Sequence, residues 1–237
     1  MRKEEILVML GTAHLGTTPG KRDPDGNFRE AVYSREIIAL VEAQLKAKGL
    51  NVLVDYRPLE PNAEMRAATA KEEQRRELNW RARWVNANCR KYGTKKCLYV
   101  PIHVNAAGSD GKWRDAGGWC CYTSVGQTQG DKLADCLYQA AREHLTGYEQ
   151  LLLAGKKTGA YGTNQKYIRT DVSDGDPDME ANFAVLAKTN CAAALTENLF
   201  QDCRSDVAFL TSEEGKAAIV AIHVDGITKY IEEVLLG

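Results

Sequence analysis

Short apolar runs alternate along the chain with longer stretches in which apolar residues recur every three or four positions. The first run, Ile6 to Leu10, is followed directly by glycine, which is typical of a buried strand. Between Glu30 and Lys48 the apolar residues follow the helical period, and Gly49 is placed to end that helix. Residues 51–56 predict a second strand. Strand, helix and strand in this order form a β–α–β unit, which requires two parallel strands.

The same patterns predict the remaining elements as far as the C-terminus. We expect helices at about 63–91, 131–145 and 212–236, and strands at 96–105, 117–125, 182–188 and 192–200. Pro101 inside a strand points to a sheet edge or a bulge. Residues 146–181 are polar and glycine-rich and show no clear period. No linker divides the chain, so the pattern predicts one α/β domain over 1–237, with a mostly parallel twisted sheet flanked by helices on both faces.

Composition narrows the class of protein. Hydrophobic residues make up 44% and charged residues 27%, as in a globular protein, and the net charge of −1 gives no reason to expect a nucleic-acid partner. No apolar run approaches the ~20 residues of a membrane span, so we expect none. The first run is too short for a secretory signal, which predicts a cytoplasmic chain as written, with a removed signal left open. Seven cysteines without a C-x-x-C pair indicate reduced core thiols.

Two histidines lie near the ends of predicted parallel strands. His14 follows the first strand by a few residues, and His103 lies near the end of the strand at 96–105. Ligand sites in open α/β sheets lie at the carboxyl edge of the strands, where both side chains would meet. The alternatives are a surface loop residue for His14 and a hydrogen-bonded core residue for His103. His144 and His223 fall inside amphipathic helices, and we interpret both as ordinary helix residues.

Two glutamates interrupt apolar surroundings. Glu30 starts the first long helix and extends the stripe of residues that faces the core, although an acid there also suits the helix dipole. Glu197 interrupts an apolar strand, where burial would raise its pKa towards that of a general base. The alternative for Glu197 is a buried ion pair, with Arg204 as the nearest candidate.

Two histidines and one glutamate form a ligand set that is known from catalytic zinc sites, in which the fourth position holds water. The sequence therefore predicts a zinc centre of His14, Glu30 and His103, with Glu197 as the base. The chain contains no H-E-x-x-H motif, which excludes a thermolysin-type site.

These four segments resemble the zinc-dependent N-acetylmuramoyl-L-alanine amidases of the amidase type 3 family. The matching segments are Leu10-Gly11-Thr12-Ala13-His14-Leu15-Gly16, Gly26-Asn27-Phe28-Arg29-Glu30, Ile102-His103-Val104-Asn105-Ala106 and Ala194-Leu195-Thr196-Glu197-Asn198-Leu199-Phe200. The resemblance spans nearly the whole chain in the right order. Ala13 and Leu15 depart from the family's glycines around the first ligand, and Pro101 stands where serine is usual.

The resemblance implies a hydrolase that cuts the amide bond between N-acetylmuramic acid and L-alanine in peptidoglycan. It implies about one zinc per chain, held by His14, Glu30 and His103, and Glu197 as the group that accepts the proton of the attacking water. We expect a monomer that reaches the cell wall either through a removed signal or by phage-type release. Trp113 and Trp119 would line the substrate groove or pack in the core.

Three other functions remain open on the sequence. Another α/β zinc hydrolase, such as a cell-wall carboxypeptidase, would use the same kind of ligand set. A dinucleotide-binding domain is less suited, because the segment from Gly11 to Gly16 has Ala13 in place of the middle glycine and a Pro- and Gly-rich loop follows it. A wall-binding module without catalysis would not explain Glu197 or the histidines at two strand ends.

Overall fold

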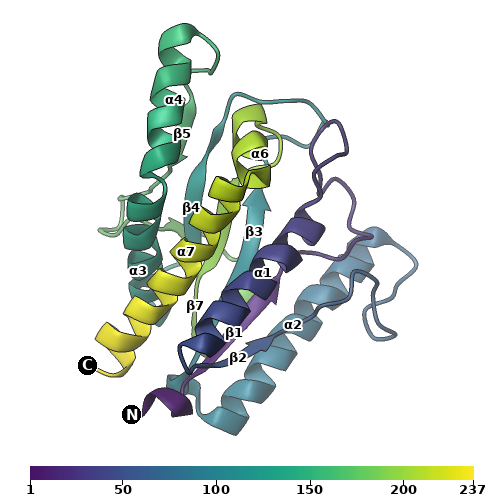
Figure 1. Cartoon of the computed structure of the whole chain (residues 1–237). Helices are drawn as coiled ribbons and strands as arrows, with labels where there is room; N and C mark the ends of the chain where they lie inside the picture. The colour runs from purple at the N-terminus through teal and green to yellow at the C-terminus, as the bar shows by residue number, and fades with distance from the viewer.

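A computed structural model describes all residues, 1–237, and contains one central sheet (Figure 1). Its strand order is β2-β1-β3-β8-β4-β5, with β7 beside β3 and β6 beside β4. Every pairing is parallel except that of β4 with β8, which confirms the mostly parallel sheet. The strands are β1 (Leu7–Thr12), β2 (Asn51–Val54), β3 (Cys97–Asn105), β4 (Gly117–Thr123), β5 (Gln165–Ile168), β6 (Met179–Glu180), β7 (Ala192–Ala193) and β8 (Leu195–Phe200).

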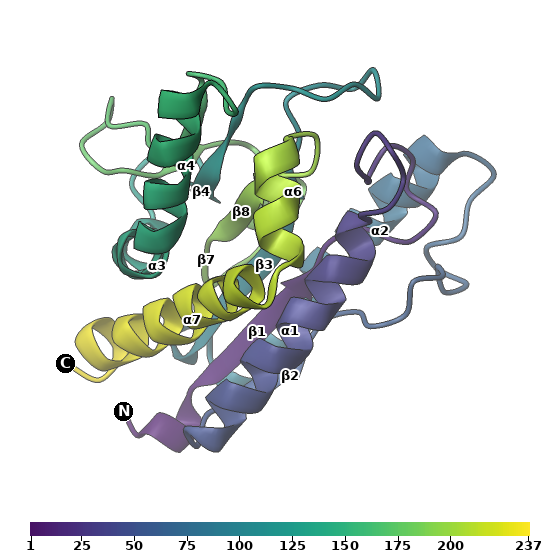
Figure 2. The same ribbon diagram turned by 45° about the horizontal axis from the view of Figure 1, so that its top comes forward.

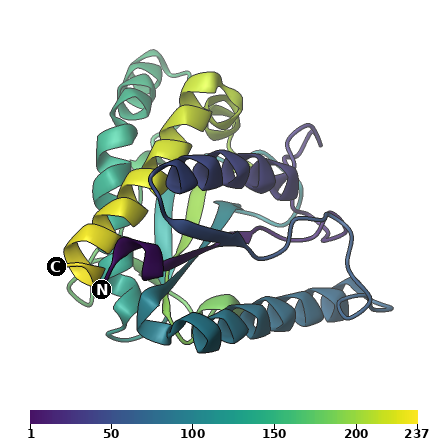
Figure 3. The same ribbon diagram turned by 60° about the horizontal axis from the view of Figure 1, so that its bottom comes forward.

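Helices cover both faces of the sheet, as the sequence predicts. Figure 3 shows α1 and α7 on one side of β1 and β2 and α2 on the other. The helices are α1 (Glu30–Ala47), α2 (Ala70–Tyr92), α3 (Gln129–His144), α4 (Thr146–Thr158), α5 (Ala184–Ala187), α6 (Arg204–Thr211) and α7 (Glu213–Tyr230). The short segments are η1 (Lys3–Glu5), η2 (Thr94–Lys96) and η3 (Ile231–Leu235). None of these helices is long and apolar enough to cross a membrane.

The first strand shows why the sheet needs two layers of helices. Ile6, Val8 and Leu10 join the larger hydrophobic core with α1, α3 and α7. Leu7 and Met9 join a smaller core with α2 and α5. Side chains alternate between the faces of a strand, so an unbroken apolar run is stable only where both faces are covered. The seven cysteines are free thiols, and six of them are buried.

Pro101 occupies the middle of the sheet, so the prediction of an edge strand is wrong. It pairs in register with Gly11 of β1, and β3 lies between β1 and β8. On the opposite side, β3 pairs with β7 as far as Tyr99 and with β8 from Ile102 onward. Pro101 falls between these two pairings. This interruption leaves room for a residue that has no N–H to donate. The irregular register in β3 falls later, between His103 and Asn105.

Three other expectations need correction. Residues 146–181 contain α4, β5 and β6, although no period was evident there. The strand predicted at 182–188 is the short helix α5, because an apolar run of that length does not distinguish the two structures. The helix predicted from residue 63 begins at Ala70, where Thr69 caps it by accepting a hydrogen bond from the Glu72 N–H.

The helix predicted at 212–236 is confirmed, since α7 begins at Glu213 and continues into η3, which ends at Leu235. The sequence does not predict α6, and α7 follows it after the single residue Ser212. The Ser212 hydroxyl accepts a hydrogen bond from the Gly215 N–H at 3.0 Å and so caps the N-terminus of α7.

Candidate metal centre

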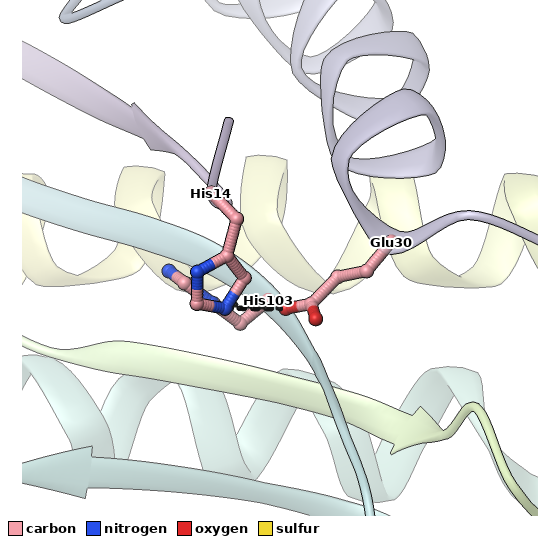
Figure 4. Close-up of side chains that lie close together, drawn as sticks. All are labelled: His14, Glu30 and His103. Atoms are coloured by element: carbon pink, nitrogen blue, oxygen red, sulfur yellow. Dashed lines mark hydrogen bonds and ion pairs between the residues drawn. The ribbon is translucent and has the colours of Figure 1, made fainter. Parts of the chain in front are cut away.

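His14, Glu30 and His103 come from three elements that converge at the carboxyl edge of the parallel strands. His14 follows β1, Glu30 is the first residue of α1, and His103 lies near the end of β3. In Figures 1 and 2 the loops after β1 and β3 gather at the end of the molecule opposite the two termini. Figure 4 shows the three side chains pointing toward one another.

The three groups are in direct contact. The Nδ1 atom of His103 lies 3.0 Å from Oε1 of Glu30, and Nε2 of His14 lies 3.5 Å from the same oxygen. The two imidazole rings are nearly perpendicular, with centroids 4.9 Å apart. One nitrogen or oxygen of each residue lies within 4.8 Å of the others, which is the spacing that one metal ion bridges.

The burial and charge of these groups fit a metal ion. Glu30 is 1% exposed, which confirms that it points inward, and its Oε2 atom has no hydrogen-bond partner. Burial lowers the pKa of His14 to about 3, against the opposing effect of Glu30. Burial opposes ionisation of Glu30, but the neighbouring His14 and His103 outweigh it and lower the pKa of the carboxyl. Neutral imidazoles and an ionised carboxylate are the forms that bind zinc.

Ser34 ties the two histidine segments together. It lies one helical turn after Glu30, and its hydroxyl accepts a hydrogen bond from the Ala13 N–H at 2.9 Å. The same hydroxyl donates to the carbonyl of Ile102 at 2.7 Å. Ala13 and Ile102 each directly precede a candidate ligand, so one buried serine fixes both segments relative to α1. The sequence signal was a polar residue on the inward stripe of that helix.

Arg35 holds the backbone of His14, the first candidate ligand. His14 has φ of 39°, a strained conformation for a residue with a β-carbon. The Arg35 guanidinium donates to the carbonyls of Ala13 at 2.9 Å and of His14 at 3.0 Å. It also donates to four other main-chain carbonyls, those of Ala31, Tyr56, Arg57 and Pro58. These contacts maintain the turn that directs the His14 ring toward Glu30, and nothing in the sequence pattern identified this residue.

Glu197 lies on the strand next to His103. The two residues are in register across the β3–β8 pairing. Its Oε2 atom is buried without a hydrogen-bond partner, and burial followed by the charge of Glu30 raises the pKa of its carboxyl well above the usual range. Arg204 does not pair with it: the guanidinium stacks 4.2 Å from the Trp113 ring centroid and lies 3.5 Å from Asp25. The alternative of an ion pair between Glu197 and Arg204 is therefore wrong.

The two tryptophans differ in environment. Trp119 is fully buried, and its indole N–H donates to Asn198 at 2.9 Å, so it belongs to the core. Trp113 is half-buried and borders a surface cavity of about 300 Å³. The structure therefore leaves Trp113 as the only one of the two that is accessible to substrate.

The two remaining histidines take structural roles within helices, as expected. His144 pairs with Asp225 at 2.8 Å near the surface. His223 is buried and hydrogen-bonded to Thr196 at 2.8 Å and to the Ile219 carbonyl at 2.7 Å.

A cavity of about 530 Å³ is lined by continuations of the same segments that carry the candidate centre. Its walls include residues 19–24, which lie between His14 and Glu30, residues of the loop after β3, and Gln201 and Asp202 after β8. The Asp202 carboxylate accepts hydrogen bonds from the N–H groups of Ala107 and Gly108, which orders the loop after β3. This cavity cannot be recognised from the sequence, because its shape depends on loops that carry no recognisable motif.

The family profile described as N-acetylmuramoyl-L-alanine amidase, Amidase_3, matches residues 8–229. An N-acetylmuramoyl-L-alanine amidase from Clostridium difficile 630 has a similar structure, with a TM-score of 0.68 at 17% identity, over 98% of this chain and 100% of that chain.

Two further amidases have a similar fold. CwlD from Clostridioides difficile, solved in complex with the GerS lipoprotein, gives a TM-score of 0.67 at 16% identity, over 96% of this chain and 98% of that chain. Ami1 from Mycobacterium smegmatis gives a TM-score of 0.66 at 15% identity, over 98% of this chain and 99% of that chain. No protein of curated function matches the sequence. At these identities the solved structures establish the fold, and the family follows from the profile match over most of the chain. The chain belongs to the N-acetylmuramoyl-L-alanine amidase family, hydrolases that cut the amide bond between N-acetylmuramic acid and the L-alanine of peptidoglycan stem peptides.

Proposed function

We propose that this amidase depends on zinc held by His14, Glu30 and His103, with Glu197 as the general base. The observation that supports the metal is the contact of two imidazoles with one buried carboxylate that keeps an unpartnered oxygen. A zinc ion bound there would supply a Lewis acid for the substrate carbonyl and would lower the pKa of a bound water towards ~7.

Glu197 performs the proton transfers in this proposal. Its carboxylate accepts the proton of the water that attacks the lactyl carbonyl of the muramoyl group. The protonated carboxyl then delivers that proton to the departing L-alanine amine, so one residue serves as base and then as acid. A raised pKa suits both roles, because a base of very low pKa would not retain the proton long enough to transfer it.

The substrate is the muramoyl–peptide junction of peptidoglycan, and the site of action is the cell wall. We propose residues 1–237 as a single catalytic domain that acts as a monomer. This is supported by the candidate centre, whose four residues all come from one chain. The cavity beside the centre is the proposed path of the stem peptide, since it is bounded by the chain that follows His103 and Glu197.

Metal content and product chemistry test the proposal on the same preparation. We expect about one zinc per chain after dialysis against a weak chelator, and new L-alanine N-termini when the protein digests peptidoglycan. His14→Ala and His103→Ala should each lose most of the zinc, because each removes one of three protein ligands. Full zinc content in either variant contradicts the ligand assignment. Release of free D-alanine without L-alanine N-termini would indicate a cell-wall carboxypeptidase instead.

A further inference from the structure

A second group of buried carboxylates lies at the edge of the sheet opposite the candidate metal centre. Strand β4 runs antiparallel to β8, so the end of β4 lies beside the beginning of β8. There β6 pairs with Tyr122 and Thr123. Asp176 and Asp178 come directly before β6, in a segment where acids alternate with other residues. No step of the proposed reaction uses this edge of the sheet.

Asp178 and Asp176 each present an oxygen that the chain leaves unsatisfied. Asp178 is 1% exposed, and its Oδ2 atom accepts a hydrogen bond from the Thr123 hydroxyl at 2.5 Å. Its Oδ1 atom is buried and has no partner. The Oδ1 atom of Asp176 is also buried without a partner. Burying one carboxylate without compensation is costly, and two adjacent ones are stable only if something neutralises their charge.

Further acids surround the pair, and the bases Arg142 and Lys132 lower the pKa of Asp135 without forming an ion pair with it. Burial, followed by contact with Asp176, raises the pKa of Asp178 to about 8. Asp131 adds to this effect, and the pKa of Asp135 is raised by burial, by Asp176 and by Asp131. No lysine or arginine forms an ion pair with any of these four acids. Neutralisation must therefore come from a proton or from a cation in solution.

We propose that Asp176 and Asp178 bind a hard divalent cation of the calcium type through their unpartnered Oδ1 atoms. Oxygen-only ligands on a loop suit calcium, which accepts carboxylates, main-chain carbonyls and water in flexible geometry. Zinc is disfavoured there because neither histidine nor a cysteine thiolate is among the ligands. Both Asp131 oxygens accept hydrogen bonds from Thr128, so Asp131 contributes charge and no ligand.

Such an ion would hold the loop before β6 against the end of β4, close to the negative charge of Asp131 at the start of α3. Asp178 already contacts Thr123 at the end of β4, and Asp131 lies in the first turn of α3. The effect would be on stability and on the order of this loop, at a distance from the catalytic edge. The site is therefore independent of the proposed reaction.

Calcium titration of the zinc-loaded protein tests the proposal. Equilibrium dialysis should give one calcium per chain in addition to the zinc, and calcium at a hundredfold excess over Kd should raise the melting temperature by roughly 5–10 °C. Asp178→Asn and Asp176→Asn should abolish both effects. Asp174→Asn is the matched control, since Asp174 is an exposed acid of the same loop, and it should bind calcium like the native protein. His103→Ala should also retain the calcium.

Three results would overturn the proposal. The first is no calcium bound at about 1 mM, the weak end of known calcium sites. The second is equal loss of binding in Asp174→Asn, which would indicate diffuse attraction to an acidic loop. The third is a free energy of unfolding that does not change with calcium but falls in the native protein as the pH rises towards about 8 and levels off above it. If Asp178→Asn lacks this fall, the pair shares a proton instead of binding a cation.

Discussion

Two buried charged groups flank the end of β1, and they are neutralised in different ways. In the first, Asp55 accepts hydrogen bonds from the Thr12 N–H at 3.0 Å and the Tyr99 hydroxyl at 2.9 Å, and it pairs with the Arg81 guanidinium. Arg81 also lies 2.8 Å from Glu77. The chain itself supplies a permanent cation in contact with both acids.

The candidate metal centre has no such cation. Glu30 contacts only imidazoles and one main-chain N–H, that of Val104, and Glu197 has no ion pair. Both glutamates keep a buried oxygen without a partner. Glu77 keeps one as well, so the missing hydrogen bond alone does not separate the two groups. What separates them is the combination of both features: at the candidate centre the buried carboxylates lack a fixed cation as well as a partner for one oxygen, which leaves a place for an ion or a proton.

The largest expected effect is on catalysis. Glu197→Gln should retain the zinc and the fold but lose roughly 10²–10⁴ in kcat, because the near-isosteric amide cannot accept the proton of the attacking water. Zinc content, melting temperature and release of L-alanine N-termini are measured on one preparation. Glu36→Gln, which alters a surface glutamate paired with Lys216 at 2.6 Å, is the control and should keep full activity. A Glu197→Gln variant that is destabilised yet active would place Glu197 among the structural charges.

A substitution in the group of Asp55, Glu77 and Arg81 should lower the stability of the fold instead of changing catalysis. Arg81→Met leaves Asp55 and Glu77 buried without a cation, and should reduce the free energy of unfolding by about 3–5 kcal/mol. Added zinc should not replace the lost cation. Arg83→Met on the same helix removes an exposed ion pair with Glu64 and should cost less than about 1 kcal/mol. Denaturant unfolding of the two variants compares them directly. Equal decreases in the free energy of unfolding in the two variants would show that the contribution of an ion pair to stability does not depend on its burial.

The same contrast bears on which features can be recognised in the sequence. Glu30, His103 and Glu197 are polar residues in apolar surroundings, and His14 follows an apolar strand by a few residues. These positions are visible without a structure. The positions of the long helices follow from the spacing of apolar residues alone. For example, the helix predicted between Glu30 and Lys48 is α1, Glu30–Ala47. The contacts that position the candidate ligands are less visible, because the six carbonyls around Arg35 come from main chain that any residue would supply.

Helix α4 shows where pattern reading fails for a physical reason. Tyr148, Leu152 and Gly155 are its buried residues and do share one face. Glycine is a poor helix former, so its presence there masks the signal. A β-carbon at Gly155 would lie 1.9 Å from the Tyr161 ring, so close packing of the following turn accounts for the glycine. Tertiary contact of this kind is not encoded in local propensity.

The smallest expected effect concerns the one lysine whose charge reaches both glutamates of the candidate centre. Lys21 lowers the pKa of Glu30 and of Glu197, where it acts against the larger effect of burial. Unlike Arg81, it forms no ion pair with either carboxylate and is partly exposed, so solvent screens it. Lys21→Gln should therefore raise the pKa of the Glu197 carboxyl only slightly.

The proposed role of Glu197 as general base determines the direction in which the pH profile shifts. A general base must be ionised to act, so a higher pKa moves the acidic limb of the pH profile of kcat/KM to higher pH, by about 0.3–1 unit. Lys157→Gln, an exposed lysine on α4, should leave the profile unchanged. Raising the salt concentration should shift the native profile in the same direction as Lys21→Gln and by no more. A shift to lower pH in Lys21→Gln would mean that the acidic limb reports a different group, and Glu197 would then not be the base that controls the reaction.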